Sequence, residues 1–195
     1  MKIGVYCGSF NPVHKGHIKI ARECVKQHLV DKVLIIATGN YWDKSIEISL
    51  QDRINMLKLY QSKQIEIEEE LNGLQYTYMI FQELKKANPN NEYNLIIGAD
   101  NLENFEKWKR YKYLLKNGLI IVKRDDMDDE YIHQEMAELK SSNYKILNIE
   151  PIDANSTYIR QNLDDYKKIK GMLDKKVYDY LKRDWKIFLF YKEFI

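Results

Sequence analysis

The chain of 195 residues is long enough to bury one hydrophobic core, and we expect a single domain over residues 1–195. Its 31 Lys and Arg against 29 Asp and Glu give a net charge of +2, which provides no electrostatic reason to expect nucleic-acid binding. No stretch approaches the roughly 18 consecutive apolar residues of a membrane span, so we expect neither nucleic acid nor membrane among the partners.

The cysteine content indicates a reducing compartment. Cys7 and Cys24 lack CxxC spacing and are too few for a secreted disulfide framework. With His28 and His133 they offer no paired metal-ligand spacing. The apolar run at the N-terminus is too short for a secretory signal and no small-residue cleavage site follows it. We therefore expect a cytoplasmic protein with reduced thiols and no metal site of its own.

Short apolar runs recur along the chain at intervals that suit alternating strands and helices. Most of them are continuous and rich in Ile, Val and Leu, as expected of strands buried on both faces of a parallel sheet. They occupy residues 3–7, 32–37, 93–97, 119–122 and 146–149. A further stretch, residues 64–68, alternates apolar and charged residues and predicts an edge strand or a half-exposed strand.

Segments with the helical period lie between these runs. Their apolar positions are Ile18, Ala21, Val25 and Leu29 in the first, Ile54, Leu57 and Tyr60 in the second, and Tyr78, Phe81 and Leu84 in the third. The third ends at Asn88-Pro89, because a residue before proline is disfavoured in a helix. Residues 125–140, acidic first and basic last, predict a surface helix, and residues 174–182 predict another.

Strands that alternate with helices predict a doubly wound α/β fold. We expect a Rossmann-like, mostly parallel sheet with helices on both faces and a small helical C-terminal part over about residues 156–195. Its aromatic tail, residues 185–195, is expected to pack against the main body or against a partner subunit, so a homo-oligomer is left open.

The first motif, GSFNPVHKGH at residues 8–17, directly follows the first predicted strand. Ligands of open α/β sheets bind beyond the carboxyl ends of the strands, which is where this motif stands. Gly8 has no Cβ and lets a phosphate approach the backbone. A helix is expected to begin near Lys15 or Gly16, and its free N–H groups favour an anion.

Two histidines in this motif suit phosphate chemistry. His14 and His17, three residues apart, face the same side of the expected helix start. Two imidazoles beside backbone amides form a donor cluster for charge that develops on a phosphoryl group. The alternative is a plain turn whose histidines are exposed or satisfied in the core. A GxGxxG fingerprint is absent at this position, which argues against an oxidoreductase.

The second motif, DANSTYIRQNL at residues 153–163, follows the strand predicted at residues 146–149. Asn155 or Ser156 is a good N-cap for a helix that carries Thr157 in its first turn. Arg160 is expected to project from that turn and to bind phosphate through charge-assisted hydrogen bonds. The alternative is an ordinary capped helix with a surface arginine.

Both motifs resemble those of one superfamily, the nucleotidyltransferase α/β-phosphodiesterases. Residues 8–17 are similar to its GxFxPxHxGH signature, with Asn11 where many members carry Asp. Residues 155–160 resemble its SSTxIR element, which binds the triphosphate of ATP, with Asn155 in place of the first Ser. The two motifs together, in this order and at this separation, are more specific than either alone.

Further stretches resemble the nicotinate-nucleotide adenylyltransferases in particular. Residues 51–60 are similar to that family's RxxM helix, and residues 172–188 to its closing helix. Residues 73–115 resemble its run of a Tyr-Thr helix start, a strand that ends in GAD and a Trp-bearing segment. A departure lies at residues 38–45, TGNYWDKS, where the family carries Pro-Pro-His-Lys and where Lys44 is expected to keep the phosphate-binding lysine.

The resemblance implies a reaction and a set of site residues. The reaction transfers AMP from ATP to nicotinate mononucleotide and releases pyrophosphate, with Mg²⁺ carried in on ATP. The implied catalytic residues are His14, His17, Lys44 and Arg160, and the implied ATP-binding residues are Gly8, Ser9, Phe10, Gly16, Gly98, Asp100, Ser156 and Thr157. Thr77, Tyr78 and Trp108 are implied to bind nicotinate mononucleotide, with Trp108 stacked on the pyridine ring.

Several alternatives stay open at this point. Nicotinamide mononucleotide or pantetheine phosphate is an alternative acceptor within the same superfamily, and a nucleotide-binding protein without catalysis is an alternative of another class. Trp108 is otherwise a half-buried surface aromatic residue. Asp100 is otherwise an N-cap, since Asn101 starts a polar helix.

Overall fold

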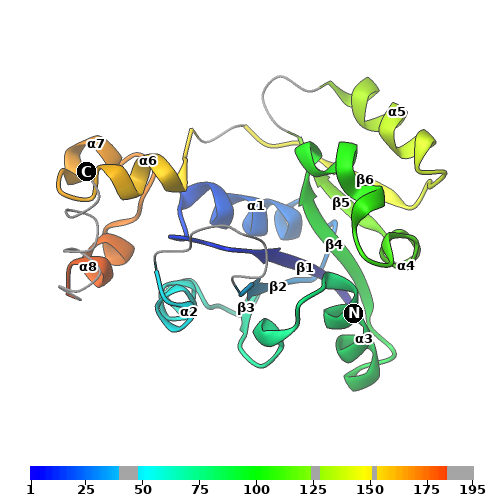
Figure 1. The fold of residues 1–195 in the computed structure, drawn as a ribbon, viewed down its shortest axis with the longest axis horizontal. Coiled ribbons are helices and arrows are strands. Elements are labelled where there is room, and N and C mark those ends of the chain that lie inside the picture. Colours follow the sequence, from blue (N-terminus) through cyan, green and yellow to red (C-terminus); the bar gives the residue numbers. More distant parts are fainter. Residues whose placement is uncertain (40–47, 124–127, 151–152, 184–195) are drawn as a thin grey trace.

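The computed structural model describes residues 1–39, 48–123, 128–150 and 153–183, and these form a layered α/β structure (Figure 1). The central sheet has six strands in the order β3-β2-β1-β4-β5-β6, and every neighbouring pair is parallel. The strands are β1 (Lys2–Gly8), β2 (Lys32–Ala37), β3 (Ile65–Glu68), β4 (Glu92–Gly98), β5 (Leu119–Val122) and β6 (Tyr144–Leu147). The predicted Rossmann-like class is confirmed.

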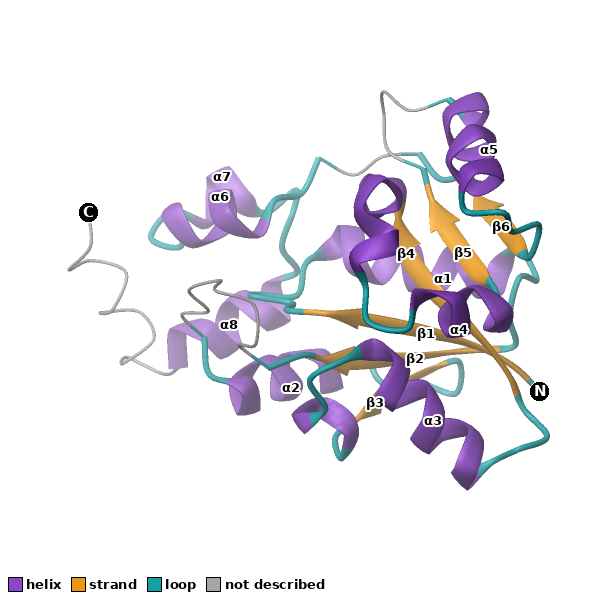
Figure 2. Ribbon diagram, turned by 45° about the vertical axis from the view of Figure 1, so that its right-hand side comes forward, coloured by secondary structure: helices purple, strands orange, loops and turns teal. Residues whose placement is uncertain are grey.

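Helices cover both faces of the sheet, and Figure 2 shows α4 in front of it and α1 behind it. One core packs α1 (Lys15–Lys26), α2 (Leu50–Lys58), α6 (Ser156–Gln161), α7 (Tyr166–Ile169) and α8 (Lys175–Arg183). The other packs α3 (Thr77–Ala87), α4 (Tyr111–Asn117), α5 (Asp129–Glu138), the 3₁₀ turn η1 (Leu71–Gly73) and the 3₁₀ segment η2 (Ala99–Lys107).

Strand β2 shows why the apolar runs are continuous. Val33 and Ile35 belong to the core under α1 and α2, while Leu34 and Ile36 belong to the core under α3 and α4. Successive side chains of a strand point to opposite faces, so a strand covered on both sides needs an apolar residue at every position.

Two predicted boundaries were wrong by a few residues. Strand β6 begins at Tyr144 instead of Ile146, because the register with β5 pairs Tyr144 with Leu119 and Leu147 with Val122. Helix α5 begins at Asp129, where the Asp128 side chain accepts a hydrogen bond from the Tyr131 amide as an N-cap. The end of α3 at Ala87 agrees with the helix stop predicted at Asn88-Pro89.

The C-terminal helices dock on the start of α1 and on α2. The Lys15 amide donates to the Met172 carbonyl at 2.9 Å, and Lys15 Nζ donates to the Lys170 carbonyl at 2.7 Å. Tyr60 OH, which follows α2, donates to Asp174 Oδ2 at 2.7 Å. Burial, together with this hydrogen bond, raises the pKa of Tyr60. The aromatic tail predicted at 185–195 lies outside the described residues.

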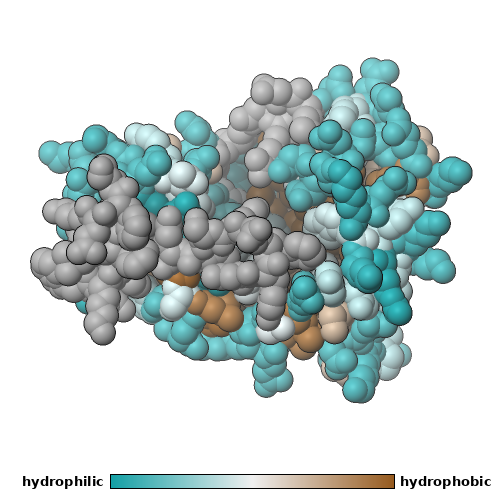
Figure 3. All heavy atoms as spheres, viewed as in Figure 1, coloured by the Kyte–Doolittle hydropathy of each residue, from teal (hydrophilic) through white to brown (hydrophobic). Residues whose placement is uncertain are grey.

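The face of the molecule in Figure 3 is mainly polar where its residues are described. In the view of Figure 3 the hydrophobic residues show as small separate groups within a hydrophilic surface. Of the helices that the structure describes, none has the length and apolar character needed to cross a membrane.

Candidate active site

The site lies at the topological switch point of the sheet, where successive strands begin to be added on the other side of β1. Strands β1 and β4 are neighbours, and the order of the sheet continues from β1 to β2 on one side and from β4 to β5 on the other. The carboxyl ends of such a pair leave a crevice for ligands. Gly8 ends β1 and Gly98 ends β4, and helices α6 and α8 lie beyond the end of β1 (Figures 1 and 2).

The loop after β1 folds tightly around the ring of Phe10. Phe10 has the left-handed φ of 47° and is only 2% exposed, so its side chain belongs to the core and is not available to a ligand. A Cβ at Gly8 would lie 3.1 Å from this ring, which explains the glycine. The Phe10 ring also meets the His17 ring edge-on, at 5.0 Å between centroids.

The two histidines form a stacked pair at the start of α1. Their ring centroids are 3.6 Å apart with an angle of 18° between the planes. His17 Nδ1 accepts a hydrogen bond from the His14 amide at 3.3 Å, so the ring proton of neutral His17 belongs on Nε2. A Cβ at Gly16 would lie 3.1 Å from the His14 ring, so glycine keeps room for the stack.

Helix α6 connects the second motif to the first. Asn155, one of the two predicted candidates, is its N-cap, and its side chain accepts from the Tyr158 amide at 3.0 Å. Ser156 Oγ donates to the Pro12 carbonyl at 3.1 Å, and Arg160 Nη1 donates to the Asn11 carbonyl at 2.8 Å. We call residues 8–17 together with residues 155–160 the phosphate corner.

Two details of α6 differ from or add to the prediction. Arg160 stands in the last turn of a six-residue helix and not in the first turn, because the helix ends after Gln161. Its Nη2 also lies 3.4 Å from Thr157 Oγ1, so the guanidinium is fixed by groups from both motifs.

Arg53 is the arginine of the RxxM helix noted in the sequence, but the sequence interpretation assigned no role to its side chain. It lies in α2, is 1% exposed, and donates to three backbone carbonyls. These are the carbonyls of Ser9 at 2.6 Å, Thr38 at 2.8 Å and Ile48 at 3.2 Å. Burial lowers the pKa of Arg53, and the carbonyls replace part of the hydration that the guanidinium loses.

A signal for Arg53 was present in the helical period. It stands three residues before Met56 and four before Leu57, both buried, so it shares the buried face of α2. Arg53 holds the loop after β1, the end of β2 and the start of α2 together. The Asn11 side chain adds to this, because its Oδ1 accepts from the Ile48 amide at 3.2 Å.

The segment after β4 lies beside the loop after β1, because the two strands are neighbours in the sheet. Asp100 lies in the first turn of η2 and is exposed. The alternative reading of Asp100 as an N-cap was wrong, because Gly98 occupies the N-cap position. The carbonyl of Gly98 accepts from Asn101 Nδ2 at 3.2 Å.

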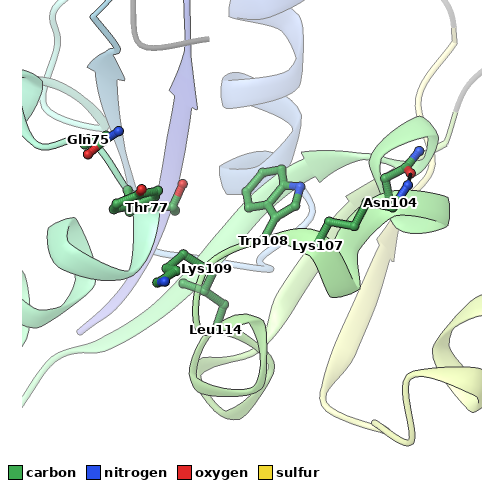
Figure 4. Close-up of a pocket in the computed structure, with 8 residues that line it drawn as sticks. Gln75, Thr77, Asn104, Lys107, Trp108, Lys109 and Leu114 are labelled. Atoms are coloured by element: carbon green, nitrogen blue, oxygen red, sulfur yellow. Dashed lines mark hydrogen bonds between the residues drawn. The ribbon is translucent and has the colours of Figure 1, made fainter.

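A cavity of about 410 Å³ lies between the start of α3 and the end of η2 (Figure 4). We call it the aromatic cavity. Thr77 and Trp108, both predicted to bind the pyridine nucleotide, line it. Tyr78 does not; it stacks on Tyr76 at 5.9 Å and lies 5.1 Å below the Arg110 guanidinium. The full lining is Gln75, Tyr76, Thr77, Asn104, Lys107, Trp108, Lys109 and Leu114.

The donor set of the site suits phosphate better than a metal ion. Imidazole, guanidinium, hydroxyl and amide groups gather in the phosphate corner. Within the described ranges no cluster of three or more His, Cys, Asp or Glu side chains is placed to hold a metal. Lys44, the remaining predicted catalytic residue, lies outside the described residues.

Comparison with known proteins agrees with this architecture and site. The family model described as cytidylyltransferase-like matches residues 5–162 and defines the class of the protein. A "Probable nicotinate-nucleotide adenylyltransferase" of Flavobacterium johnsoniae is 32% identical over 189 residues, which cover 93% of this chain and 96% of the relative. One of the same name from Fusobacterium nucleatum is 34% identical over 193 residues, with 95% and 99% covered. The chain belongs to the nicotinate-nucleotide adenylyltransferase family within the cytidylyltransferase-like class.

Solved structures share the fold. The Plasmodium falciparum nicotinic acid mononucleotide adenylyltransferase complexed with NaAD aligns with a TM-score of 0.77 at 22% identity, over 93% of this chain and 95% of that one. The same enzyme complexed with APC aligns with a TM-score of 0.74 at 20% identity, over 93% and 94%. At these identities the likeness describes the fold.

Proposed function

We propose that the protein is a nicotinate-nucleotide adenylyltransferase, which transfers AMP from ATP to nicotinate mononucleotide and releases pyrophosphate. The proposal rests above all on one contact, the hydrogen bond from Arg160 to the Asn11 carbonyl. This contact, over 149 positions of sequence, brings the guanidinium to the loop that leads into His14 and His17 at the start of α1. A single polyphosphate can therefore meet all three cationic or donor groups.

The reaction requires the protein to align the two substrates and to stabilise the negative charge that develops on the leaving pyrophosphate. A phosphate oxygen of nicotinate mononucleotide attacks the α-phosphorus of ATP, and the bond from that phosphorus to the oxygen that bridges the α- and β-phosphates breaks. The attacking oxygen is already ionised at neutral pH, so no general base is needed. Pyrophosphate leaves with the electron pair of the broken bond, and negative charge grows on it.

The histidine pair is suited to that growing charge. Because His17 Nδ1 accepts from a backbone amide, its Nε2 is the donor that can face a phosphate oxygen. Stacking against His14 and edge contact with Phe10 hold the ring in one orientation. A donor that is already oriented costs no reorganisation in the transition state.

The remaining cationic side chains are proposed to bind the outer phosphates of ATP. Arg160, fixed by Asn11 and Thr157, would bind them through charge-assisted hydrogen bonds, and Lys44 is proposed to act with it. Mg²⁺ is proposed to enter as part of the nucleotide and to be held by its phosphate oxygens. Gly8, Ser9, Gly16 and Ser156 would line the phosphates, and Gly98 and Asp100 the adenosine.

The aromatic cavity is proposed to hold the pyridine ring. Trp108 offers an aromatic face, and Thr77 lies at the other side of the cavity in Figure 4. Since Tyr76 lines the cavity and Tyr78 does not, Tyr76 is the tyrosine proposed to contact the ligand. The cytoplasmic location, the single domain and the homo-oligomer remain predictions.

An assay of pyrophosphate release tests the proposal. The purified chain is given ATP and Mg²⁺ with nicotinate mononucleotide, nicotinamide mononucleotide or pantetheine phosphate. We expect the highest kcat/KM with nicotinate mononucleotide, and a dinucleotide product of the matching mass. Release with pantetheine phosphate alone would assign a different acceptor, and no release with any acceptor would leave a nucleotide-binding protein without catalysis.

A further inference from the structure

We propose that the side chain of Lys109 makes the aromatic cavity select an acid over the corresponding amide. The inference rests on the proposed function, because it concerns how the acceptor is chosen. Nicotinate and nicotinamide mononucleotides differ only in a carboxylate against a carboxamide on the ring. A residue that separates them has to respond to charge.

The charge of the aromatic cavity is the first observation. Two of its lining side chains, Lys107 and Lys109, are cationic, and none of its lining residues is acidic. Trp108 stands between these two lysines in the sequence, and its ring contributes an aromatic wall to the cavity. A flat aromatic ring with a negative substituent fits this combination, whereas a neutral ring gains only the aromatic contact.

The two lysines differ in how they are engaged. Lys107 Nζ donates to Asn104 Oδ1 at 2.6 Å, on the side of Trp108 that faces away from Thr77 in Figure 4. Lys109 extends on the other side, where Thr77 and Gln75 lie (Figure 4). Within the described part of the chain, no hydrogen bond or ion pair occupies the Lys109 ammonium. Lys109 is therefore the lysine available to a ligand.

The backbone on either side of Lys109 is fixed. The Trp108 amide donates to the Phe105 carbonyl at 3.0 Å, and the two rings lie 5.2 Å apart. Arg110 has a left-handed φ of 55° and its guanidinium covers the Tyr78 ring. Lys109 is thus held at the edge of the cavity by both neighbours, and only its side chain adjusts to the ligand.

The chemistry of the two ligands then gives the preference. A carboxylate accepts charge-assisted hydrogen bonds from an ammonium group. A carboxamide carries no charge and offers one oxygen acceptor, while its NH₂ group is a donor that an ammonium cannot satisfy. The interaction with Lys109 is electrostatic, so salt should weaken the preference.

The test measures kcat/KM for both mononucleotides with saturating ATP, in Lys109→Gln and Lys109→Glu. We expect Lys109→Gln to lower the ratio of kcat/KM for the acid to that for the amide about tenfold, with the amide value nearly unchanged. Lys109→Glu should lower the ratio further. Raising the ionic strength should lower the ratio of the unmodified protein and leave that of Lys109→Gln unchanged.

Two lysines of the same segment serve as controls. Lys112→Gln, in α4, removes the same charge from a side chain that lies over the Tyr111 ring, and the ratio should not change. Lys107→Gln should change the ratio less than Lys109→Gln, since Asn104 engages that ammonium.

Each other outcome overturns the inference. An equal fall for both mononucleotides in Lys109→Gln means that the lysine binds their shared phosphate, and an unchanged ratio means that it selects nothing. An equal change of the ratio in Lys112→Gln means that the net charge of the segment acts, and not Lys109. If the unmodified protein adenylylates neither mononucleotide, the proposed function itself fails, which is a separate result.

Discussion

The phosphate corner and the aromatic cavity are built in different ways. In the phosphate corner, hydrogen bonds to backbone carbonyls join segments that are far apart in sequence, from Arg160 to Asn11 and from Arg53 to Ser9. The aromatic cavity is held by ring contacts between near neighbours, such as Phe105 with Trp108. The proposed reaction centre is therefore tied together by contacts between distant segments, whereas the proposed recognition site is held by near neighbours and carries exposed side chains such as Lys107 and Lys109.

The largest effect is expected from removing a hydrogen-bond donor of the phosphate corner. His17→Ala should lower kcat by about 10²–10³, the weight of a preorganised donor to transition-state charge. Stopped or continuous pyrophosphate assays measure it, and circular dichroism should show an unchanged fold. His133→Ala, which removes an exposed imidazole bonded to Tyr144, is the matched control. An unchanged kcat in His17→Ala would contradict the assigned role.

The next largest effect is expected on stability, from removing the side chain that holds the first loop of the phosphate corner in place. Arg53→Met leaves the carbonyls of Ser9, Thr38 and Ile48 without their donor and should lower the free energy of unfolding by about 3 kcal/mol, at about 1 kcal/mol for each bond. Urea unfolding measures the loss. Lys58→Met in the same helix breaks an exposed ion pair with Glu69 and should cost less than about 1 kcal/mol. An equal loss of unfolding free energy in Arg53→Met and Lys58→Met would contradict the stabilising role of Arg53.

A smaller effect is expected at the outer phosphates. Arg160→Ala should raise the KM for ATP about 10- to 100-fold, the range of a lost charge-assisted hydrogen bond, with a smaller change in kcat. Steady-state kinetics with varied ATP measure this. Lys168→Ala, on the exposed side of α7, removes a charge as a control. An unaltered affinity for ATP in Arg160→Ala argues against its role.

The smallest effect belongs to the aromatic cavity. Trp108→Ala should raise the KM for nicotinate mononucleotide about fivefold, since an aromatic contact contributes roughly 1 kcal/mol beyond its buried area. The KM for ATP should not change, and Trp108→Phe should restore most of the affinity. If the KM for ATP rises as much as the KM for the mononucleotide, the two regions are not independent.

The fold was predictable because its signals are local. Apolar runs such as Lys32–Ala37 are continuous where both faces are covered, and Asn88-Pro89 ends α3 as expected. The start of α1 at Lys15 and the cap at Asn155 were also predictable from residue types near each end. The start of β6 was not, because its register depends on pairing with β5, which the local residue pattern does not show.

The site was predictable only in its residue types. His14, His17 and Arg160 were proposed from their motifs, and the contact that brings Arg160 to the loop before His14 is a long-range one that spacing does not reveal. Arg53 was noted only as part of the RxxM helix and was given no role, because a charged residue inside a helix is usually exposed and only its carbonyl partners account for its burial. Tyr78 was predicted to bind the mononucleotide, but the sequence does not show that Arg110 covers its ring or that Tyr76 lines the cavity instead.

The hydrogen bonds from Lys15, at the start of α1, to the carbonyls of Lys170 and Met172 have a consequence for biosynthesis. The loop after β1 leaves the ribosome early, but the partners of Lys15 follow only after 155 further positions. At roughly 5–20 residues per second, translation needs on the order of ten to thirty seconds to deliver them. A nascent chain therefore carries the histidine pair long before it can hold a nucleotide, and a product truncated before α6 should not compete with the finished protein for ATP.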